Sequence, residues 1–301
     1  MSRPSCRDCP TIRTILYLVF LALLCCGEAT AARDPVCDLS HAEDPLLQQK
    51  LNNLIKQENL AEETRRGGLA LTLLILSDPQ HPRLAQINGN KMMYAASLPK
   101  IVILLGAAVE IDEGRLELDV ETRQDIHRMI RRSCNDCSNR MIERVGEDEL
   151  TELVQSPRFQ FYDNKDGGLW LGKAFGPSLA WKRDPRLNLS HAATTFQAAR
   201  FYCGLDRGTL VSPKQNQLML DAMSRPGINH KFVKGLKSYE DIEIFRKSGT
   251  WLTWHADSAL VRSGDVTYVI VGLAHSPFGG RWLEELAGPL HKLALSWPVS
   301  E

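Results

Sequence analysis

AASLPKIVILLGAAVEIDEG, residues 95–114, joins a polar start to a long apolar run. We predict a helix that begins at Ser97 and ends near Gly114, and its apolar character on nearly all sides indicates that it is buried. Ser97 and Lys100 are three positions apart and therefore share one face of the first turn. A lysine whose pKa is lowered by burial or by a neighbouring cation can take the proton of a serine hydroxyl. Alone, however, the pair also fits an N-cap serine followed by a solvated lysine.

The elements around this helix are sorted into blocks of strands and blocks of helices. An amphipathic helix at 43–62 precedes an apolar strand at 67–77, which a turn connects to a second strand at 83–89. Residues 115–210 have helical patterns and long loops, and the last third of the chain has three strands and a closing helix. This separation of strands from helices indicates an α+β fold, with an antiparallel sheet flanked by helices and an inserted all-helical lobe.

The N-terminus is predicted to be a secretory signal peptide. It has a basic head, an apolar run of about a dozen residues and an Ala-x-Ala end, and the run is short for a membrane span of roughly 20 residues. A lipid anchor on Cys25 or Cys26 is less favoured, because neither cysteine follows a small residue. We therefore expect a periplasmic or secreted protein without a stable membrane span. The predicted parts are the signal peptide at 1–32, a sheet lobe at 33–95 and 211–301, and a helical lobe at 96–210.

The charge balance favours a protein that acts on a small molecule or a peptide. The 301 residues carry 36 Lys and Arg against 36 Asp and Glu. No basic run that could bind a phosphate backbone follows the N-terminus. We therefore expect no nucleic-acid partner, and we expect a monomer.

Four of the eight cysteines would leave with the signal peptide, which leaves Cys37, Cys134, Cys137 and Cys203. Export permits disulfides, but four thiols allow three pairings, and the sequence does not choose between them. The C-x-x-C of Cys134 and Cys137 could indicate redox chemistry or metal binding. Because the sequence has no second ligand pair at metal spacing, we predict neither a metal site nor a cofactor.

Two motifs further along the chain favour a catalytic function for the pair Ser97 and Lys100. SCN at 133–135 lies in the connection between two predicted helices, and KSG at 247–249 lies on the first strand of the final meander. In this order and placement, the three motifs resemble the Ser-x-x-Lys, Ser-x-Asn and Lys-Thr-Gly elements of the class A β-lactamases and the penicillin-binding DD-peptidases. The resemblance extends over essentially the whole mature chain and implies the α+β fold of these serine hydrolases.

The resemblance implies a role in acylation for four residues. Ser97 is the expected nucleophile, and Lys100 is its expected proton acceptor or relay. Ser133 is expected to pass a proton to the leaving nitrogen. The backbone N–H groups of Ser97 and Thr250 would bind the oxyanion, one from the helix start and one from the strand edge.

The resemblance also implies a set of substrate-binding residues. Asn135 would hold the side-chain amide of the substrate and Lys100. Lys247 would attract the substrate carboxylate and acidify Ser133. Ser248 stands where threonine is common and keeps the hydroxyl that binds this carboxylate, and Gly249 completes the motif.

In class A β-lactamases the acyl-enzyme is hydrolysed with the help of a glutamate followed by Pro-x-Leu-Asn. Residues 181–188, WKRDPRLN, resemble this element, but an aspartate replaces the glutamate. Asp184 would be the base, and Asn188 would help to hold the water. Asp-Pro is also a common turn dipeptide, and a shorter side chain can misplace a catalytic group. The gaps from Ser97 to Ser133 and after Asp184 are short for class A, which implies a more open cleft.

These observations predict an exported serine hydrolase that acts through an acyl-enzyme on β-lactam amides. A DD-peptidase or esterase on the same fold is the first alternative, favoured by the aspartate and the short gaps, with cell-wall peptide or another acyl compound as substrate. A catalytically weak binding domain is the second alternative, against which the intact set of two serines and two lysines argues. No Gly-x-Ser-x-Gly motif surrounds a serine, so a Ser-His-Asp triad is not favoured.

Overall fold

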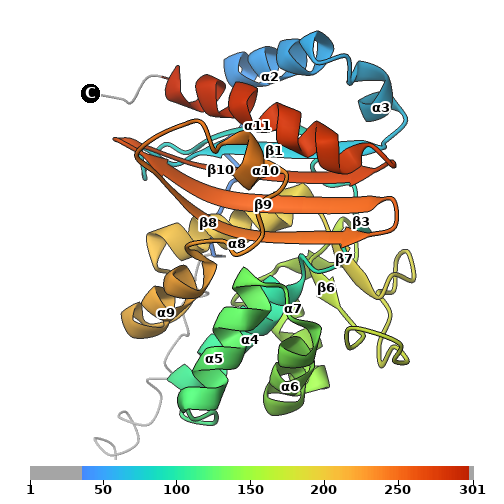
Figure 1. Ribbon diagram of the computed structural model, residues 1–301, viewed down its shortest axis with the longest axis vertical. Coiled ribbons are helices and arrows are strands. Elements are labelled where there is room, and N and C mark those ends of the chain that lie inside the picture. Colours follow the sequence, from blue (N-terminus) through green and yellow to red (C-terminus); the bar gives the residue numbers. More distant parts are fainter. Residues whose placement is uncertain (1–35, 298–301) are drawn as a thin grey trace, which may run out of the picture. The chain divides into compact units, whose positions relative to one another are not determined.

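The computed structural model describes residues 36–297, and a five-stranded antiparallel sheet is its central element (Figure 1). The strands follow the order β2-β1-β10-β9-β8, so the two ends of the chain supply neighbouring strands. This arrangement confirms the predicted α+β fold. The predicted signal peptide lies outside the described residues. The strands are β1 (Leu69–Ile75), β2 (Arg83–Ile87), β8 (Ile242–Trp251), β9 (Trp254–Ser263) and β10 (Val266–His275).

Helices cover both faces of this sheet. Helices α2 (Pro45–Gln57) and α11 (Gly279–Leu295) lie together on one face, and α8 (Thr195–Arg207) packs against β1 and β10 on the other (Figure 1). All seven residues of β1 are buried, and all but Thr72, whose hydroxyl donates to Thr195 Oγ1 at 2.8 Å, are apolar. Alternate side chains of a strand point to opposite faces. Accordingly, Leu71 packs in the core beneath α11 and Leu74 in the core beside α8.

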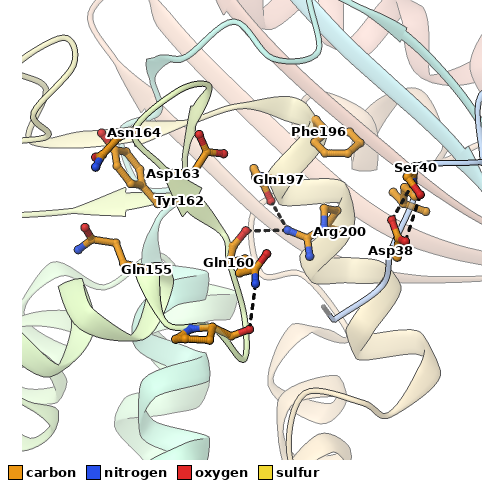
Figure 2. Close-up of a pocket in the computed structure, with 12 residues that line it drawn as sticks. Asp38, Ser40, Gln155, Gln160, Tyr162, Asp163, Asn164, Phe196, Gln197 and Arg200 are labelled. Atoms are coloured by element: carbon orange, nitrogen blue, oxygen red, sulfur yellow. Dashed lines mark hydrogen bonds between the residues drawn. The ribbon is translucent and has the colours of Figure 1, made fainter. Parts of the chain in front are cut away.

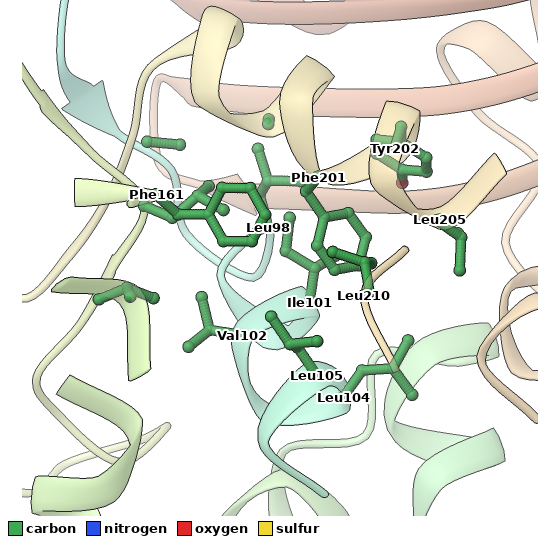
Figure 3. Packing of buried hydrophobic residues seen from close by; sticks show 14 of the residues in the cluster. Leu98, Ile101, Val102, Leu104, Leu105, Phe161, Phe201, Tyr202, Leu205 and Leu210 are labelled. Atoms are coloured by element: carbon green, nitrogen blue, oxygen red, sulfur yellow. The ribbon is translucent and has the colours of Figure 1, made fainter. Parts of the chain in front are cut away.

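The apolar helix predicted from residues 95–114 is the centre of the helical part. Around α4 (Lys100–Asp112) lie α5 (Val120–Arg131), α6 (Asn135–Val145), α7 (Glu147–Gln155) and α9 (Pro213–Met223); α3 (Ala61–Arg65) and α10 (Phe232–Gly235) are short helices elsewhere in the chain. Every residue of α4 from Lys100 to Val109 is buried. Figure 3 shows Ile101 beside Phe201 of α8, so the helix also packs toward the sheet. The prediction of a buried helix is confirmed.

Helix α4 begins at Lys100, three residues later than the predicted start at Ser97. Residues 97–99 form tight turns instead, in which the N–H of Lys100 donates to Ser97 O at 3.3 Å and the N–H of Ile101 donates to Leu98 O at 3.1 Å. The N-cap position is Pro99. Ser97 therefore lies in the turn that leads into the helix rather than capping it.

The long connection before α8 contains short strands. Two of them, β6 and β7, form a three-stranded sheet with β3, which precedes α4, in the order β3-β7-β6, and β4 and β5 form a separate pair. Because β3 ends just before the turn of Ser97, the three-stranded sheet attaches this connection to the turn. The strands are β3 (Met93–Tyr94), β4 (Tyr162–Asp163), β5 (Gly167–Gly168), β6 (Trp170–Leu171) and β7 (His191–Ala193).

Two disulfides settle the cysteine pairing that the sequence left open. Cys37 pairs with Cys203 of α8 and so ties the segment before α2 to the sheet. Cys134 pairs with Cys137 across the first turn of α6. The C-x-x-C motif is therefore a disulfide beside the Ser-x-Asn motif.

Two predictions about the organisation of the chain can be compared with the described residues. The division into a sheet lobe and a helical lobe stays a prediction, and α8, which falls in the range predicted for the helical lobe, packs on the sheet. Within residues 36–297, no helix combines the length and the apolar character that crossing a membrane requires.

Candidate active site

The three motifs meet around the side chain of Ser133. Lys100 Nζ, at the start of α4, donates hydrogen bonds to Ser133 O at 2.7 Å and to Asn135 Oδ1 at 2.8 Å, and it lies 3.3 Å from Ser133 Oγ. From β8, Lys247 Nζ donates to Ser133 Oγ at 3.0 Å. One hydroxyl is thus shared by two lysines that come from distant parts of the sequence.

Ser97 lies in the wall of the cavity that these motifs surround. The cavity has a volume of about 540 Å³, and Ser97, Asn135 and Thr250 all border it. Gly249 of β8 lies against the turn that holds Ser97, since a side-chain carbon on Gly249 would collide with Ala95 O and lie 2.6 Å from Ser97 N. Only glycine allows so close an approach of two backbones. An oxyanion hole with one N–H from each segment needs this proximity.

Aromatic side chains form much of the remaining wall. Tyr94, Phe175 and Trp251 border the cavity, and the Phe175 ring lies 4.3 Å from Lys100 Nζ. Asn139 of α6 holds the backbone of Phe175 by two hydrogen bonds, of 2.8 and 2.9 Å. The ring therefore covers the lysine, and charges beneath it interact more strongly than they would in water.

The backbone of Ser133 is in the left-handed region, with a φ of 56°. Residues other than glycine rarely adopt this conformation, and those that do gather at functional sites. The next residue, Cys134, is fixed by its disulfide to Cys137 and by a hydrogen bond from its N–H to Arg128 O at 3.2 Å. The disulfide therefore supports the segment that directs Ser133 toward both lysines.

Burial changes the protonation of both lysines. The pKa of Lys100, which has no exposed surface, is lowered by burial to about 7. Burial and the charges of Lys100 and Arg246 hold the pKa of Lys247 well below its usual value, against the attraction of Asp257. At neutral pH the two lysines therefore carry less than two full positive charges between them. A lysine in this state can serve as a base.

Two residues that contact the Lys-Ser-Gly strand could not be assigned to it from the sequence. His230 Nε2 lies 3.2 Å from Ser248 Oγ, and burial and the charge of Lys231 lower the pKa of His230 to about 4. Lys231 Nζ donates to Gly249 O at 2.6 Å and to Thr250 Oγ1 at 2.8 Å. Both residues come from the irregular segment before α10, where no periodicity or motif marks them.

Asp184 does not border the cavity and is bound within its own loop. Its buried carboxylate accepts hydrogen bonds from the Tyr162 hydroxyl at 2.7 Å and from the N–H groups of Arg186, Leu187 and Leu189 at 3.0, 2.9 and 3.1 Å. Burial alone would raise the pKa of Asp184, but these hydrogen bonds hold it below its usual value. A carboxylate with four donors has little capacity left to orient a water. The role of Asp184 as deacylation base stays a prediction, and this geometry does not support it.

Asn188 closes the same loop. Its N–H donates to Asp184 O at 3.0 Å, and its φ of 57° is in the left-handed region, which asparagine tolerates. Its side chain is exposed, and the residue does not border the cavity. Of the predicted site residues, Ser97, Asn135 and Thr250 border the cavity, and hydrogen bonds join Lys100, Ser133, Asn135 and Lys247. Asp184 and Asn188 do not border the cavity.

Replacing Asp184 by asparagine should destabilise the fold by about 2–3 kcal/mol, because the amide cannot replace a charged acceptor of several hydrogen bonds. Urea unfolding followed by circular dichroism measures this change. Asp163→Asn is the matched control: its exposed carboxylate binds two backbone N–H groups, and its loss should reduce stability less. A stable Asp184→Asn protein whose acyl-enzyme decays at least about 100-fold more slowly would instead identify Asp184 as the base.

A second pocket, shown in Figure 2, lies beside the N-terminal end of the described range and contains a buried arginine side chain. The Arg200 guanidinium donates to Val36 O, Gln160 O and Gln197 Oε1, each at 2.7 Å, and to Cys37 O at 3.2 Å. Its donors are therefore used within the protein. We interpret Arg200 as a structural tether for the segment before α2 rather than as a ligand site.

Solved structures of similar fold include β-lactamases and a protein named PBP-A. A β-lactamase from Sphaerobacter thermophilus DSM 20745 has a TM-score of 0.64 at 15% identity, with 81% of this chain and 99% of that chain covered. A β-lactamase from Chitinophaga pinensis DSM 2588 has a TM-score of 0.62 at 16% identity, with 80% and 98% covered. PBP-A has a TM-score of 0.61 at 19% identity, with 83% and 97% covered. At such identities these structures show a shared fold alone.

The sequence itself matches a family model. No curated protein matches the chain. The model described as the beta-lactamase enzyme family, however, matches residues 119–281, which is more than half of the chain. This range includes Ser133 and Lys247 and begins after Ser97 and Lys100. The chain therefore belongs to the beta-lactamase enzyme family.

Proposed function

We propose that the protein is an exported serine hydrolase that forms an acyl-enzyme on Ser97, with β-lactam amides as substrates. The observation that carries the proposal is the contact of Ser133 Oγ with both Lys100 and Lys247, because it links the three motifs. Export is proposed from the predicted signal peptide. The two disulfides are consistent with an oxidising compartment.

In the proposed acylation, Ser97 Oγ attacks the substrate carbonyl while its proton moves to the neutral amine of Lys100. A pKa of about 7 leaves a large share of Lys100 as free amine at neutral pH. The negative charge on the carbonyl oxygen is bound by the N–H groups of Ser97 and Thr250. As the C–N bond breaks, Ser133 gives its proton to the leaving nitrogen and regains one from the Lys100 ammonium. The net result is the transfer of one proton from Ser97 to the leaving amine, and Lys100 and Ser133 return to their starting protonation.

The proposed carboxylate site is formed by Lys247, Ser248 and His230. Lys247 supplies positive charge, and the Ser248 hydroxyl, whose oxygen lies 3.2 Å from His230 Nε2, is the proposed donor to the carboxylate. Asn135 borders the cavity, is held by Lys100 and is proposed to bind the substrate's side-chain amide. A substrate with an amide at one end and a carboxylate at the other would span these groups, as β-lactams and acyl-peptides do.

The Asp184 loop favours a second candidate, a penicillin-binding peptidase or esterase on the same fold. Rapid hydrolysis of an acyl-enzyme needs a base and a positioned water. In the structure the Asp184 carboxylate is occupied by Tyr162 and its own loop. The second candidate therefore acylates as the first does but releases the acyl group slowly or transfers it to another acceptor.

Labelling with a fluorescent penicillin tests the proposed acylation. We expect a covalent adduct of one penicillin per chain, and peptide mapping by mass spectrometry should place it on Ser97. Heat-unfolded protein is the control, because acylation depends on the assembled site. If folded protein forms no adduct with any β-lactam, ester or acyl-D-Ala-D-Ala peptide, the proposal fails.

The rate at which the adduct is lost separates the two candidates. Steady turnover of nitrocefin with rapid loss of the Ser97 adduct would select the β-lactamase activity. An adduct that persists for many minutes, together with turnover of a D-Ala-D-Ala peptide or a simple ester, would select the second candidate.

A further inference from the structure

Lys231 is a buried lysine for which the proposed reaction has no role. Its exposed fraction is 2%, and Nζ donates to Gly249 O at 2.6 Å, to Thr250 Oγ1 at 2.8 Å and to Ala256 O at 3.0 Å. Three acceptors match the three N–H groups of an ammonium. The backbone of Lys231 also has a φ of 50°, which lysine rarely adopts. The chain thus accepts strain and charge burial to place this ammonium beneath β8.

The acceptor Gly249 O belongs to the peptide unit whose N–H is the proposed oxyanion donor of Thr250. Gly249 lies opposite Ala256 of β9, and Lys231 Nζ binds the carbonyl oxygens of both. A trans peptide unit is planar, with its C=O and N–H pointing in opposite directions. Lys231 Nζ binds Gly249 O together with Ala256 O of β9, so we place Gly249 O on the β9 side of the strand. Because β8 is the last strand in the sheet order, the N–H of Thr250 is then directed to the edge that has no neighbouring strand. Thr250 borders the cavity on that edge.

We propose that Lys231 strengthens the oxyanion hole by polarising the Gly249–Thr250 peptide unit, and thus acts as a positioning residue for acylation of Ser97. This inference rests on the proposed function. A hydrogen bond to the oxygen of an amide makes its N–H a stronger donor, since linked hydrogen bonds polarise one another. The ammonium also adds positive potential where the carbonyl oxygen of the substrate becomes negative. The hydrogen bond from Lys231 Nζ to Thr250 Oγ1 also holds the side chain of Thr250, the residue whose N–H is the proposed oxyanion donor.

A purely structural role would not need a charge at this position. Burying an ammonium is strongly unfavourable, and apolar residues of similar volume often stabilise such sites as well or better. Asp257, the carboxylate nearby, is already paired with Arg246 through contacts of 2.6 and 2.9 Å. The hydrogen bonds of Lys231 are therefore directed at the strand that lines the cavity rather than at a carboxylate.

Two measurements on Lys231→Met test the inference. Acylation by penicillin should fall about tenfold, which is less than the 10²- to 10³-fold loss typical of removing an oxyanion donor altogether. With penicillin ¹³C-labelled at the lactam carbonyl, difference infrared spectroscopy should show the Ser97 ester carbonyl at higher frequency than in wild type, because its hydrogen bonds are weaker. Lys231→Gln, which keeps a neutral donor, should lie between the two. Lys234→Met removes a lysine that is paired with Glu284 at the surface and should change neither value.

Each outcome distinguishes this inference from the proposed function. A folded, acylated Lys231→Met protein with an unchanged carbonyl frequency would overturn the inference and leave acylation of Ser97 intact. Absence of an adduct on Ser97 in the wild-type protein would instead remove the proposed function. If circular dichroism shows that neither Lys231 variant folds, the inference is also overturned, because the residue is then a requirement of the structure.

Discussion

Replacing Lys100 by methionine should slow the acylation of Ser97 by about 10³-fold, within the range that general-base catalysis supplies. Methionine has a similar length but no nitrogen to take the serine proton. Lys100 is buried at the first position of α4, and methionine also removes the hydrogen bonds of Nζ to Ser133 and Asn135, so the stability of the variant is measured beside its acylation. Rapid-quench labelling with fluorescent penicillin measures the acylation rate constant, and thermal unfolding reports whether the fold is retained.

Lys100→Arg is the sharper control for this prediction. Arginine keeps the positive charge but does not lose its proton at accessible pH. If Lys100 acts as a base, Lys100→Arg should therefore be acylated as slowly as Lys100→Met. In wild type, acylation should rise as the pH increases through about 7, where the Lys100 ammonium becomes the free amine. Both variants should lack this rise. An active Lys100→Arg protein would show that the charge of Lys100, rather than its basicity, is what acylation needs.

The convergence of the motifs was predictable because Lys100 and Lys247 lie on elements that the local pattern reveals, and SCN lies in the connection between two predicted helices. The length of the apolar run after Lys100 favours a buried helix over a strand, and the strands of the meander alternate toward the two cores. The order of Ser97, Ser133 and Lys247 along the chain then sufficed to predict one pocket, by resemblance to serine hydrolases of the same element order. The structure places Ser133 Oγ within 3.3 Å of both lysines.

The orientation of Asp184 was not predictable from its local sequence. An Asp-Pro-x-Leu-Asn segment can direct its carboxylate toward a cavity or back into its own turn, and the residues within the segment do not decide between these. The deciding contact is the hydroxyl of Tyr162, which is 22 residues away and belongs to a two-residue strand. Lys231 could not be found for a similar reason, since two of its three acceptors are backbone oxygens of β8 and β9, which no side-chain pattern reveals.

Gly249→Ala is expected to reduce acylation at least about 100-fold, because a misplacement of roughly 1 Å in a catalytic group can have that effect. The added methyl would collide with Ala95 O and lie 2.6 Å from Ser97 N and 2.9 Å from Leu98 N. All three are backbone atoms, so no side-chain rotation relieves the collision. Strand β8 must then move away from the turn of Ser97, which separates the N–H groups of Ser97 and Thr250. Acylation rate constants for penicillin, compared with those of wild type, measure the loss.

A second glycine separates this effect from a general loss of stability. Gly264, in the β9–β10 turn, has a φ of 57° and no atoms near the position of an added Cβ. Gly264→Ala should therefore destabilise the fold by about 1–2 kcal/mol through backbone strain alone and leave acylation of the folded protein unchanged. Thermal unfolding and acylation rates are measured for both variants. Gly264→Ala should lose stability and keep its acylation rate, whereas Gly249→Ala should lose acylation. Wild-type acylation by Gly249→Ala would mean that β8 need not lie against Ser97, and the oxyanion hole proposed between them would have to be abandoned.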